Sequence, residues 1–354
     1  MADDPKKYQE AVKAGLDRAY DNENLTETTF DVDRDRLIIF SDLHRGARDG
    51  ADDFWRCERS YHAALGYYLE AGHKLYLLGD VEELWENGHD EVMKAYANTL
   101  ALEQEFHRAG RLERFWGNHD DSWRHEGDVE KRLHPLYPGL VVHEAMRIRI
   151  VDGEKPLGLL FLVHGHQGTM DSDRFAGVSR LVVRHAWRPF QRRWGIASTV
   201  PSIDFALRAR HDEAMFEWAR NRPERLVLIA GHTHRPVFSD PKVKKQRTPD
   251  EVDAELKRLR EAADATPDGL ASLRAEYELV RTAQFGDPPK KMPLPCYFNT
   301  GCCSYGDGDV TGIEIVDGRI RLIRWLDDDA APKFKVLADE PLREILAAVE
   351  GSHH

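Results

Sequence analysis

Short apolar runs, each followed by a polar or glycine-rich turn, recur through the first two thirds of the chain. Runs of four or five apolar residues bounded in this way are typical of strands that are buried on both faces. The pattern predicts five such strands: Leu37–Phe40, Leu75–Leu78, Leu112–Trp116, Leu159–Val163 and Leu226–Ala230.

Helical patterns alternate with the first three of these strands. The spacing predicts a helix over 54–71 that ends at Gly72, and a long amphipathic helix over 90–109 that ends at Gly110. From Leu140 the pattern of apolar positions predicts short strands with little helix between them, at 140–142, 146–151 and 157–163. We therefore predict a layered α/β fold in which a second sheet packs against the first.

The domain organisation follows from composition along the chain. Residues 174–194 mix apolar side chains with arginines, which suits either a cap that covers a site or touches a membrane surface, or an ordinary core face with solvated arginines. The charged segment 240–292 suits a helical hairpin that covers the site, pairs two copies or is merely solvated. The predicted parts are a polar lead-in with a solvated helix around 8–20 (1–29), a core (30–169, 223–239 and 293–335), a helical cap (170–222), a charged helical insertion (240–292) and a C-terminal tail with a tag-like end (336–354).

Composition narrows the function classes. A net charge of −12 over 354 residues disfavours a general nucleic-acid coat. It does not exclude phosphate substrates, because bound divalent cations reverse the local field. The first residues contain no apolar signal segment, and the four cysteines lack the paired spacing of a zinc site or a disulfide framework. These features favour a cytoplasmic protein with reduced thiols.

Chemistry-bearing side chains follow the predicted strands. Because ligands bind at the carboxyl ends of strands in α/β sheets, these side chains should converge on one site. Oxygen and imidazole donors without thiolate suit Mn²⁺, Fe or Zn²⁺. Seven donors are too many for one tetrahedral ion but suit two ions that share a carboxylate and clamp a phosphoryl group. The donors are Asp42, His44, Asp80, Asn118, His164, His232 and His234.

Four further residues are candidates for catalytic or positioning roles beside the metals. His119 follows a candidate ligand, and Asp120 beside it could hold the imidazole in orientation. Arg45 could bind a phosphate through two hydrogen bonds or form a salt bridge with Asp49. His166 could orient a ligand, lie close to a metal or be structural. The histidine pairs also suggest a metallo-β-lactamase site, but neither continues into the H-x-H-x-D-H pattern of that fold.

Five short sequence blocks carry the candidate ligands: Asp42-Leu43-His44, Gly79-Asp80, Gly117-Asn118-His119-Asp120, His164-Gly165 and Gly231-His232-Thr233-His234. In this order along the chain, they resemble the signature of the calcineurin-like metallophosphoesterase superfamily. The resemblance implies a two-sheet sandwich flanked by helices. It implies one metal held by Asp42, His44, Asp80 and His234, and a second held by Asp80, Asn118, His164 and His232, with Asp80 bridging. It assigns His119 to phosphate stabilisation or to protonation of the leaving group.

The implied activity is hydrolysis of a phosphate ester or pyrophosphate by a metal-bridging hydroxide, with two divalent ions, Mn²⁺ favoured. The segments 41–44 and 79–85, with the Arg- and Trp-rich insertion, resemble the UDP-2,3-diacylglucosamine hydrolase branch, which cleaves a pyrophosphate in a nucleotide-sugar lipid. However, His166 stands where that branch usually has Asp. The run His164-Gly165-His166 is more similar to the small phosphodiesterases of the superfamily. The expected partner is a phosphate-containing small molecule or lipid-linked substrate, with peripheral membrane contact through 174–194. A non-catalytic scaffold and a nuclease are the alternatives, the latter disfavoured by charge.

Overall fold

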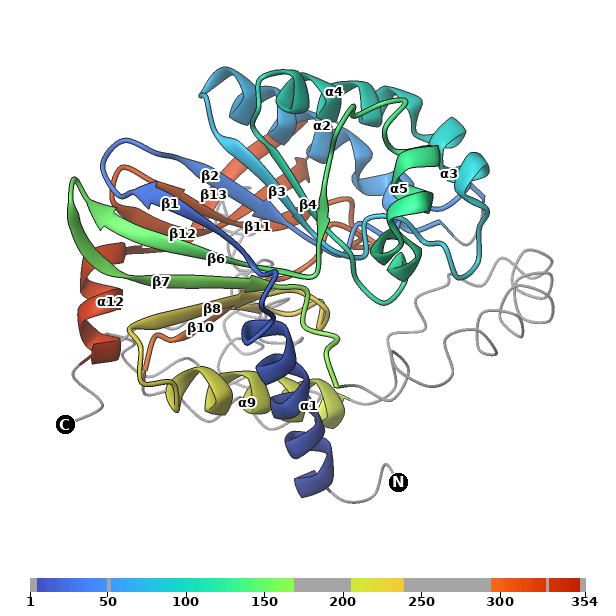
Figure 1. The fold of residues 1–354 in the computed structure, drawn as a ribbon. Coiled ribbons are helices and arrows are strands. Elements are labelled where there is room, and N and C mark those ends of the chain that lie inside the picture. Colours follow the sequence, from blue (N-terminus) through green and yellow to red (C-terminus); the bar gives the residue numbers. More distant parts are fainter. Residues whose placement is uncertain (1–4, 50–51, 169–204, 239–293, 329–330, 351–354) are drawn as a thin grey trace, which may run out of the picture.

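The computed structural model describes residues 5–49, 52–168, 205–238, 294–328 and 331–350, whose strands form two stacked sheets (Figure 1). The expected hairpin over 240–292 and the segment 174–194 lie outside the described residues. Of the predicted cap over 170–222, the part that is described contains the helix α9 (Phe205–Arg220). The predicted α/β class, with two sheets flanked by helices, is confirmed.

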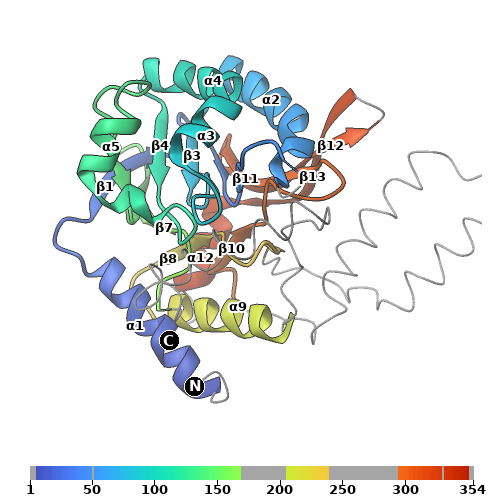
Figure 2. The ribbon, with the colours of Figure 1, turned by 90° about the vertical axis from the view of Figure 1, so that its right-hand side faces the viewer.

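The first sheet has seven strands in the order β13-β12-β11-β2-β3-β4-β5. The strands β2 to β5 run parallel, whereas β11, β12 and β13 are antiparallel to their neighbours. Helices cover its outer face (Figure 2). The elements are β2 (Leu37–Phe40), β3 (Lys74–Leu78), β4 (Leu112–Phe115), β5 (Val142–His143), β11 (Val310–Val316), β12 (Arg319–Asp328), β13 (Ala331–Pro341), α2 (Phe54–Glu70), α3 (His89–Ala95), α4 (Ala97–Arg108), the 3-10 turn η1 (Asp121–Arg124) and α5 (Glu126–Arg132).

The second sheet has six strands in the order β1-β6-β7-β8-β10-β9. Its outer face is covered by α1 (Pro5–Tyr20) and α9, while α12 (Leu342–Glu350) packs against strands of both sheets (Figure 1). The strands are β1 (Thr26–Asp31), β6 (Ala145–Asp152), β7 (Lys155–Val163), β8 (Leu226–Ala230), β9 (Pro236–Val237) and β10 (Tyr297–Thr300).

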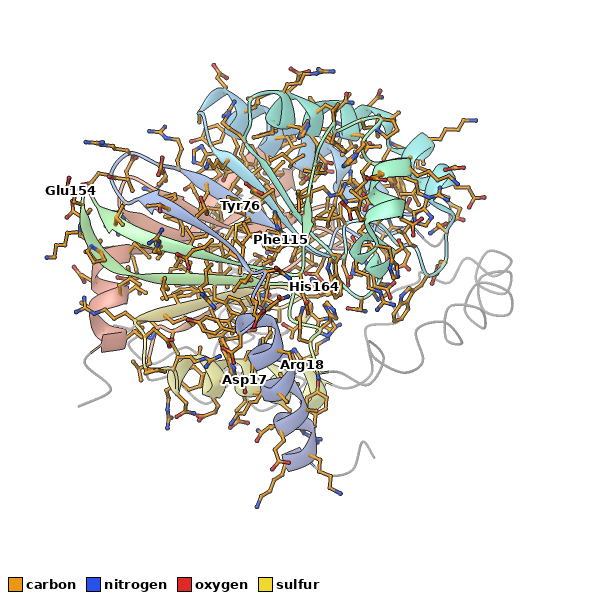
Figure 3. All side chains as sticks on the ribbon, viewed as in Figure 1. Asp17, Arg18, Tyr76, Phe115, Glu154 and His164 are labelled. Carbon is orange, nitrogen blue, oxygen red and sulfur yellow. The ribbon has the colours of Figure 1, made fainter. Side chains whose placement is uncertain are left out.

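Both faces of the seven-stranded sheet are buried, which explains the unbroken apolar runs. Side chains alternate along a strand, so Leu37 and Ile39 join the core between the sheets, whereas Ile38 and Phe40 join the core beneath α2 and α4. Figure 3 shows Tyr76 and Phe115 in the layer between the two sheets. The five predicted strands are present with ends shifted by at most a few residues.

Three predictions about individual elements need correction. The lead-in contains the expected helix, α1, but this helix is not solvated: it buries Val12 and Leu16 completely, and the edge strand β1 follows it. The expected tail after residue 335 contains most of β13 and all of α12, where Leu342 is fully buried. The single helix over 90–109 is two helices interrupted at Tyr96, whose φ of −113° is not helical. The burial of α1 and α12 depends on partners that only the tertiary structure supplies.

No helix in the described part of the chain combines the length and apolarity that crossing a bilayer requires.

Candidate metal centre

The turns that carry the predicted ligands are strained. Five predicted ligands have a left-handed backbone, with φ between 50° and 68°: Asp42, His44, Asp80, His232 and His234. Among the described residues, only Arg48 and Asp317 are further non-glycine residues with positive φ. A left-handed conformation costs about 1 kcal/mol or more for a residue with a Cβ, and it persists where the surroundings impose it. Such strain, concentrated at the ends of β2, β3 and β8, is typical of a functional site.

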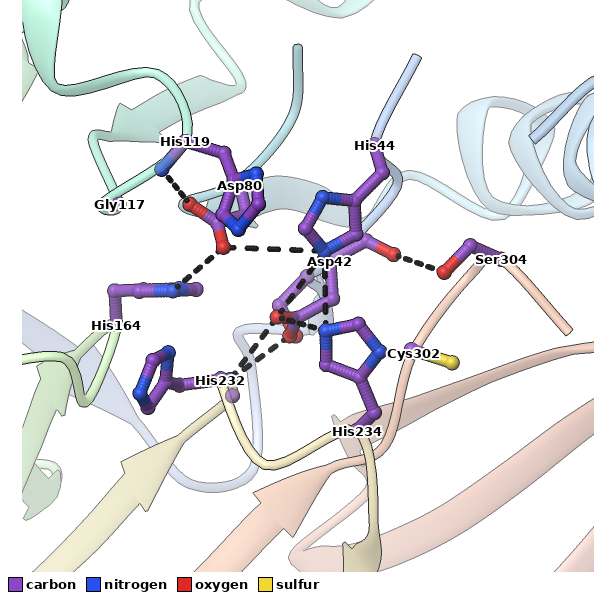
Figure 4. A network of polar contacts seen from close by, with 12 residues as sticks. Asp42, His44, Asp80, Gly117, His119, His164, His232, His234, Cys302 and Ser304 are labelled. Carbon is purple, nitrogen blue, oxygen red and sulfur yellow. Dashed lines mark hydrogen bonds and ion pairs between the residues drawn. The ribbon is translucent and has the colours of Figure 1, made fainter. Parts of the chain in front are cut away.

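Asp42, His44 and His234 form one group of donors (Figure 4). The Nε2 atoms of His44 and His234 lie 3.0 Å apart, and His234 Nε2 lies 3.3 Å from Asp42 Oδ1. Two imidazole nitrogens at this distance can share at most one proton, and two lone pairs would repel each other. The separation suits two nitrogen ligands of one cation with bonds of about 2.1 Å.

Asp80, His164 and His232 form a second group. His164 Nε2 lies 3.2 Å from Asp80 Oδ2, and this oxygen is also 3.8 Å from His44 Nε2 of the first group. The other carboxylate oxygen, Oδ1, accepts a hydrogen bond of 2.8 Å from the backbone N–H of His119. The backbone thereby orients Asp80 so that one oxygen faces both groups.

Asn118 lies in the same turn as this contact. Its Oδ1 atom is buried and has no hydrogen-bond partner among the described residues. A buried acceptor without a partner costs about 1–3 kcal/mol, so this atom calls for a ligand. Asn118 belongs to the set predicted to hold the second metal.

Hydrogen bonds from outside the two groups fix which imidazole nitrogen carries a proton. Nδ1 of His164 donates to the carbonyl oxygen of Leu78 at 2.8 Å, so that in the neutral ring the lone pair is on Nε2. Nδ1 of His44 lies 3.3 Å from Glu83 Oε2, which has the same effect on that ring. Partners of this kind orient metal-binding histidines and raise their affinity for metal.

His119 is held by Glu83 and not by its neighbour Asp120. Its Nδ1 lies 2.6 Å from Glu83 Oε2, and its ring stacks on Trp85 with centroids 4.2 Å apart at 18°. The prediction that Asp120 orients His119 is therefore wrong. The buried Asp120 carboxylate instead accepts the backbone N–H groups of Gly117 at 2.6 Å and Val81 at 2.8 Å.

The structure also contradicts Arg45 as a phosphate ligand. Its side chain is fully buried, with NH1 3.1 Å from Glu103 and NH2 3.4 Å from Glu82. Arg114 pairs with the same Glu82 at 2.6 Å. Arg45 thus neutralises buried carboxylates beneath the turns after β2 and β3, where no substrate reaches it.

Two glycines make room for the ligands. A Cβ on Gly117 would lie 2.6 Å from the backbone nitrogen of Asp80 and closer still to its Oδ1. A Cβ on Gly231 would lie 2.5 Å from Asp42 Oδ2. Both distances are too short for any real contact, so these positions explain why glycine precedes the Asn-His and His-Thr-His motifs.

The charges of the cluster are strongly coupled. Burial lowers the pKa of an imidazole, but Glu83 and Asp80 outweigh it and raise the pKa of His119 to about 10. For His164, burial again works downward, and Asp80 raises the pKa to about 9. Burial would raise the pKa of Asp80, yet His164 and His119 hold it well below its usual range. Without a bound cation, protons on these rings supply the positive charge that the carboxylates require.

The remaining histidines near the cluster are neutral. Burial and the neighbouring His164 lower the pKa of His166 to about 3, and its ring lies between His164 and Trp116. His166 is therefore packed beside a ligand. Burial and His211 lower the pKa of His232 well below its usual value, which leaves a neutral donor for a metal.

These residues could hold metal ions. The six Asp and His donors predicted from the sequence lie in groups whose donor atoms are within 4.8 Å of one another, and Asn118 lies in the adjoining turn. His119 belongs to a third such group with His44 and Asp80. Sequence reasoning missed Glu83 as the partner of two histidines. The signal for it was its position three residues after Asp80, in the turn that β3 delivers to the site.

Comparison with known proteins adds little to this geometry. No protein-family model matches the chain, and no curated protein matches it. Among solved structures, the chain is similar to Vacuolar Protein Sorting 29 from Cryptosporidium parvum, at 11% identity over 87% of this chain and 98% of that one, with a TM-score of 0.35. A likeness this weak leaves function to be argued from the residues themselves.

Proposed function

We propose that the protein is a metallophosphoesterase, a dinuclear-metal-dependent hydrolase of a phosphate ester or a pyrophosphate. The observation that carries this proposal is the position of Asp80 Oδ2, 3.2 Å from His164 Nε2 and 3.8 Å from His44 Nε2. A carboxylate oxygen that faces two sets of imidazole donors is suited to bridge two cations. The order of the sequence motifs from Asp42 to His234 gives independent support.

Two bound divalent cations would polarise a phosphoryl group and provide a nucleophile at neutral pH. Donors of oxygen and nitrogen without sulfur favour Mn²⁺, with Fe or Zn²⁺ as alternatives. Asp42, His44, Asp80 and His234 would hold one cation, and Asp80, Asn118, His164 and His232 the other.

His119 is suited to act on the substrate directly. In the metal-free protein Glu83 and Asp80 raise its pKa to about 10, and Glu83 occupies Nδ1. The proton on Nε2 is then left to stabilise a phosphate oxygen or to protonate the leaving oxygen. Trp85 covers one face of the ring and restricts its rotation.

The substrate that fits best is a phosphate-containing small molecule or a lipid-linked phosphate, including a nucleotide-sugar lipid of the UDP-2,3-diacylglucosamine type. The acidic balance of the chain disfavours nucleic acid. Every predicted ligand position carries a donor, which favours a hydrolase over a non-catalytic scaffold. We further propose a cytoplasmic protein, with membrane contact through residues 174–194 if the substrate is a lipid.

A metal-loaded assay tests this proposal. The protein, loaded with Mn²⁺, Fe²⁺ or Zn²⁺ in turn, is assayed with p-nitrophenyl phosphate, its bis ester and a UDP-lipid analogue side by side. Asp80→Asn should lose metal and hydrolysis together. Asp317→Asn is a matched control, because Asp317 has the same left-handed φ of 50° but lies in an exposed turn far along the chain. Full metal loading of the wild type with no hydrolysis of any phosphate compound would refute the proposed activity.

A further inference from the structure

The loop that follows His164 is in direct backbone contact with α1. A Cβ on Gly15 would lie 2.5 Å from the carbonyl carbon of Gln167 and from the nitrogen of Gly168. In turn, a Cβ on Gly168 would lie 2.5 Å from the carbonyl carbon of Ala11. Glycines on both sides therefore allow the helix and the loop to touch without intervening side chains.

His211, on α9, connects α1 to the loop that follows His164. Its Nε2 bonds to the carbonyl oxygen of Gly165 at 2.7 Å, and its Nδ1 lies 2.8 Å from the hydroxyl of Tyr8 on α1. A carbonyl only accepts, so the proton is on Nε2. With the proton on Nε2, Nδ1 of the neutral ring is left to accept the proton of the Tyr8 hydroxyl.

The same imidazole contacts the residue after His164 and the ring of His232, the two histidines of the second donor group. Gly165 follows His164 directly, with a φ of 114° that fixes the direction in which the chain leaves this ligand. The ring of His211 also packs edge-on against His232, with centroids 5.1 Å apart at 64°. One buried side chain thus touches the backbone beside one candidate ligand and the ring of the other.

We propose that Tyr8 and His211 form a positioning relay that holds His164 and His232 in their metal-binding arrangement, so that the N-terminal helix is a working part of the site. This proposal rests on the proposed metal function of those two histidines. The Gly165 carbonyl fixes the tautomer of His211, and the Tyr8 hydroxyl holds the His211 ring in orientation. His211 in turn holds the Gly165 carbonyl, and with it the turn that carries His164. Supports of this kind around ligands set the affinity of a metal site.

Hydrogen exchange in the metal-free, full-length protein tests the relay without any assumption about activity. Tyr8→Phe removes only the hydroxyl, so α1 should stay folded. We expect amide exchange in peptides covering residues 164–168 to become roughly fivefold faster, the effect of one lost hydrogen bond. Asp17→Asn is the control: Asp17 also joins α1 to α9, through Trp218 Nε1 at 2.8 Å and Arg222 at 3.1 Å, but this contact is away from the loop. It should leave exchange at 164–168 unchanged.

Metal titration gives a second measurement. Tyr8→Phe should weaken one of two Mn²⁺ sites by about tenfold in calorimetry and leave the other intact. His211→Gln, which retains an N–H donor for the Gly165 carbonyl, should keep more affinity than His211→Leu. Unchanged exchange at 164–168 in Tyr8→Phe, or an equal change in Asp17→Asn, would overturn the relay. A wild type that binds no metal or hydrolyses nothing would count against the proposed function alone, since the exchange comparison decides the relay separately.

Discussion

Gly117→Ala should damage the site although it removes no functional group. The added Cβ would lie 2.6 Å from the backbone nitrogen of Asp80 and 2.8 Å from Cδ2 of His164, whereas ordinary contacts begin at 3.4 Å. The Asp80 turn must therefore move by at least about 0.8 Å, and a misplacement near 1 Å can reduce turnover about 100-fold. Because the shift affects Asp80 and His164 together, we expect weaker binding of the second metal as well.

The assay measures metal content by mass spectrometry and turnover of p-nitrophenyl phosphate on the same preparation, with the melting temperature as a folding check. Gly66→Ala is the matched control: Gly66 is exposed on α2, and a Cβ there would meet nothing within 4 Å. That substitution should leave metal and turnover unchanged and stabilise the helix by about 0.5–1 kcal/mol. If Gly117→Ala kept full metal content and turnover, the inferred contact between Gly117 and the Asp80 carboxylate would be wrong.

Three other expectations concern single groups. His119→Ala should reduce turnover by at least about 100-fold, because it removes the proposed proton donor, while metal content measured after loading stays near that of the wild type; loss of metal would instead make His119 a ligand. Arg45→Met should lower the free energy of unfolding in urea by about 3–5 kcal/mol, because it leaves the buried Glu103 without its cation and Glu82 with Arg114 alone. A change below 1 kcal/mol would contradict the buried ion network. Mn²⁺ should bind more tightly as pH rises from 6 to 8.5, since the pKa of His164 is raised to about 9 and its proton must leave before a cation binds. The same raised pKa of His164 stabilises the metal-free fold below pH 6.5, and this stabilisation is lost as pH rises through 9. The increase in melting temperature on adding Mn²⁺ should therefore grow with pH. An increase that shrinks with pH would refute this linkage.

The strands and the ligands that follow them were accessible to sequence reasoning because both are local. Leu37 to Phe40 form an unbroken apolar run because successive side chains enter two different cores. Asp42 and His44 come directly after that run, so the end of the strand and the position of the donors are encoded together. The carboxyl ends of neighbouring parallel strands then lie at one edge of the sheet, whatever the details of packing.

The partners of these ligands could not be read in the same way. Asp120 is adjacent to His119 in sequence, yet the backbone of the turn directs its carboxylate to N–H groups of the β3 and β4 turns. Glu83 reaches His119 and His44 only because the turn after β3 folds back across both. Side-chain direction at the end of a strand depends on backbone torsions that the residue types do not specify.

What the sequence by itself determined is the set of buried strands, the two-sheet class and the identity of the candidate donors. Only the tertiary structure decided that Arg45 is a buried counter-ion, that α1 and α12 belong to the core, and that Tyr8 lies against His211. The physical reason is that an apolar run or a motif is selected by interactions within a few residues. The burial of a charge or of a narrow helix face depends instead on partners far away along the chain.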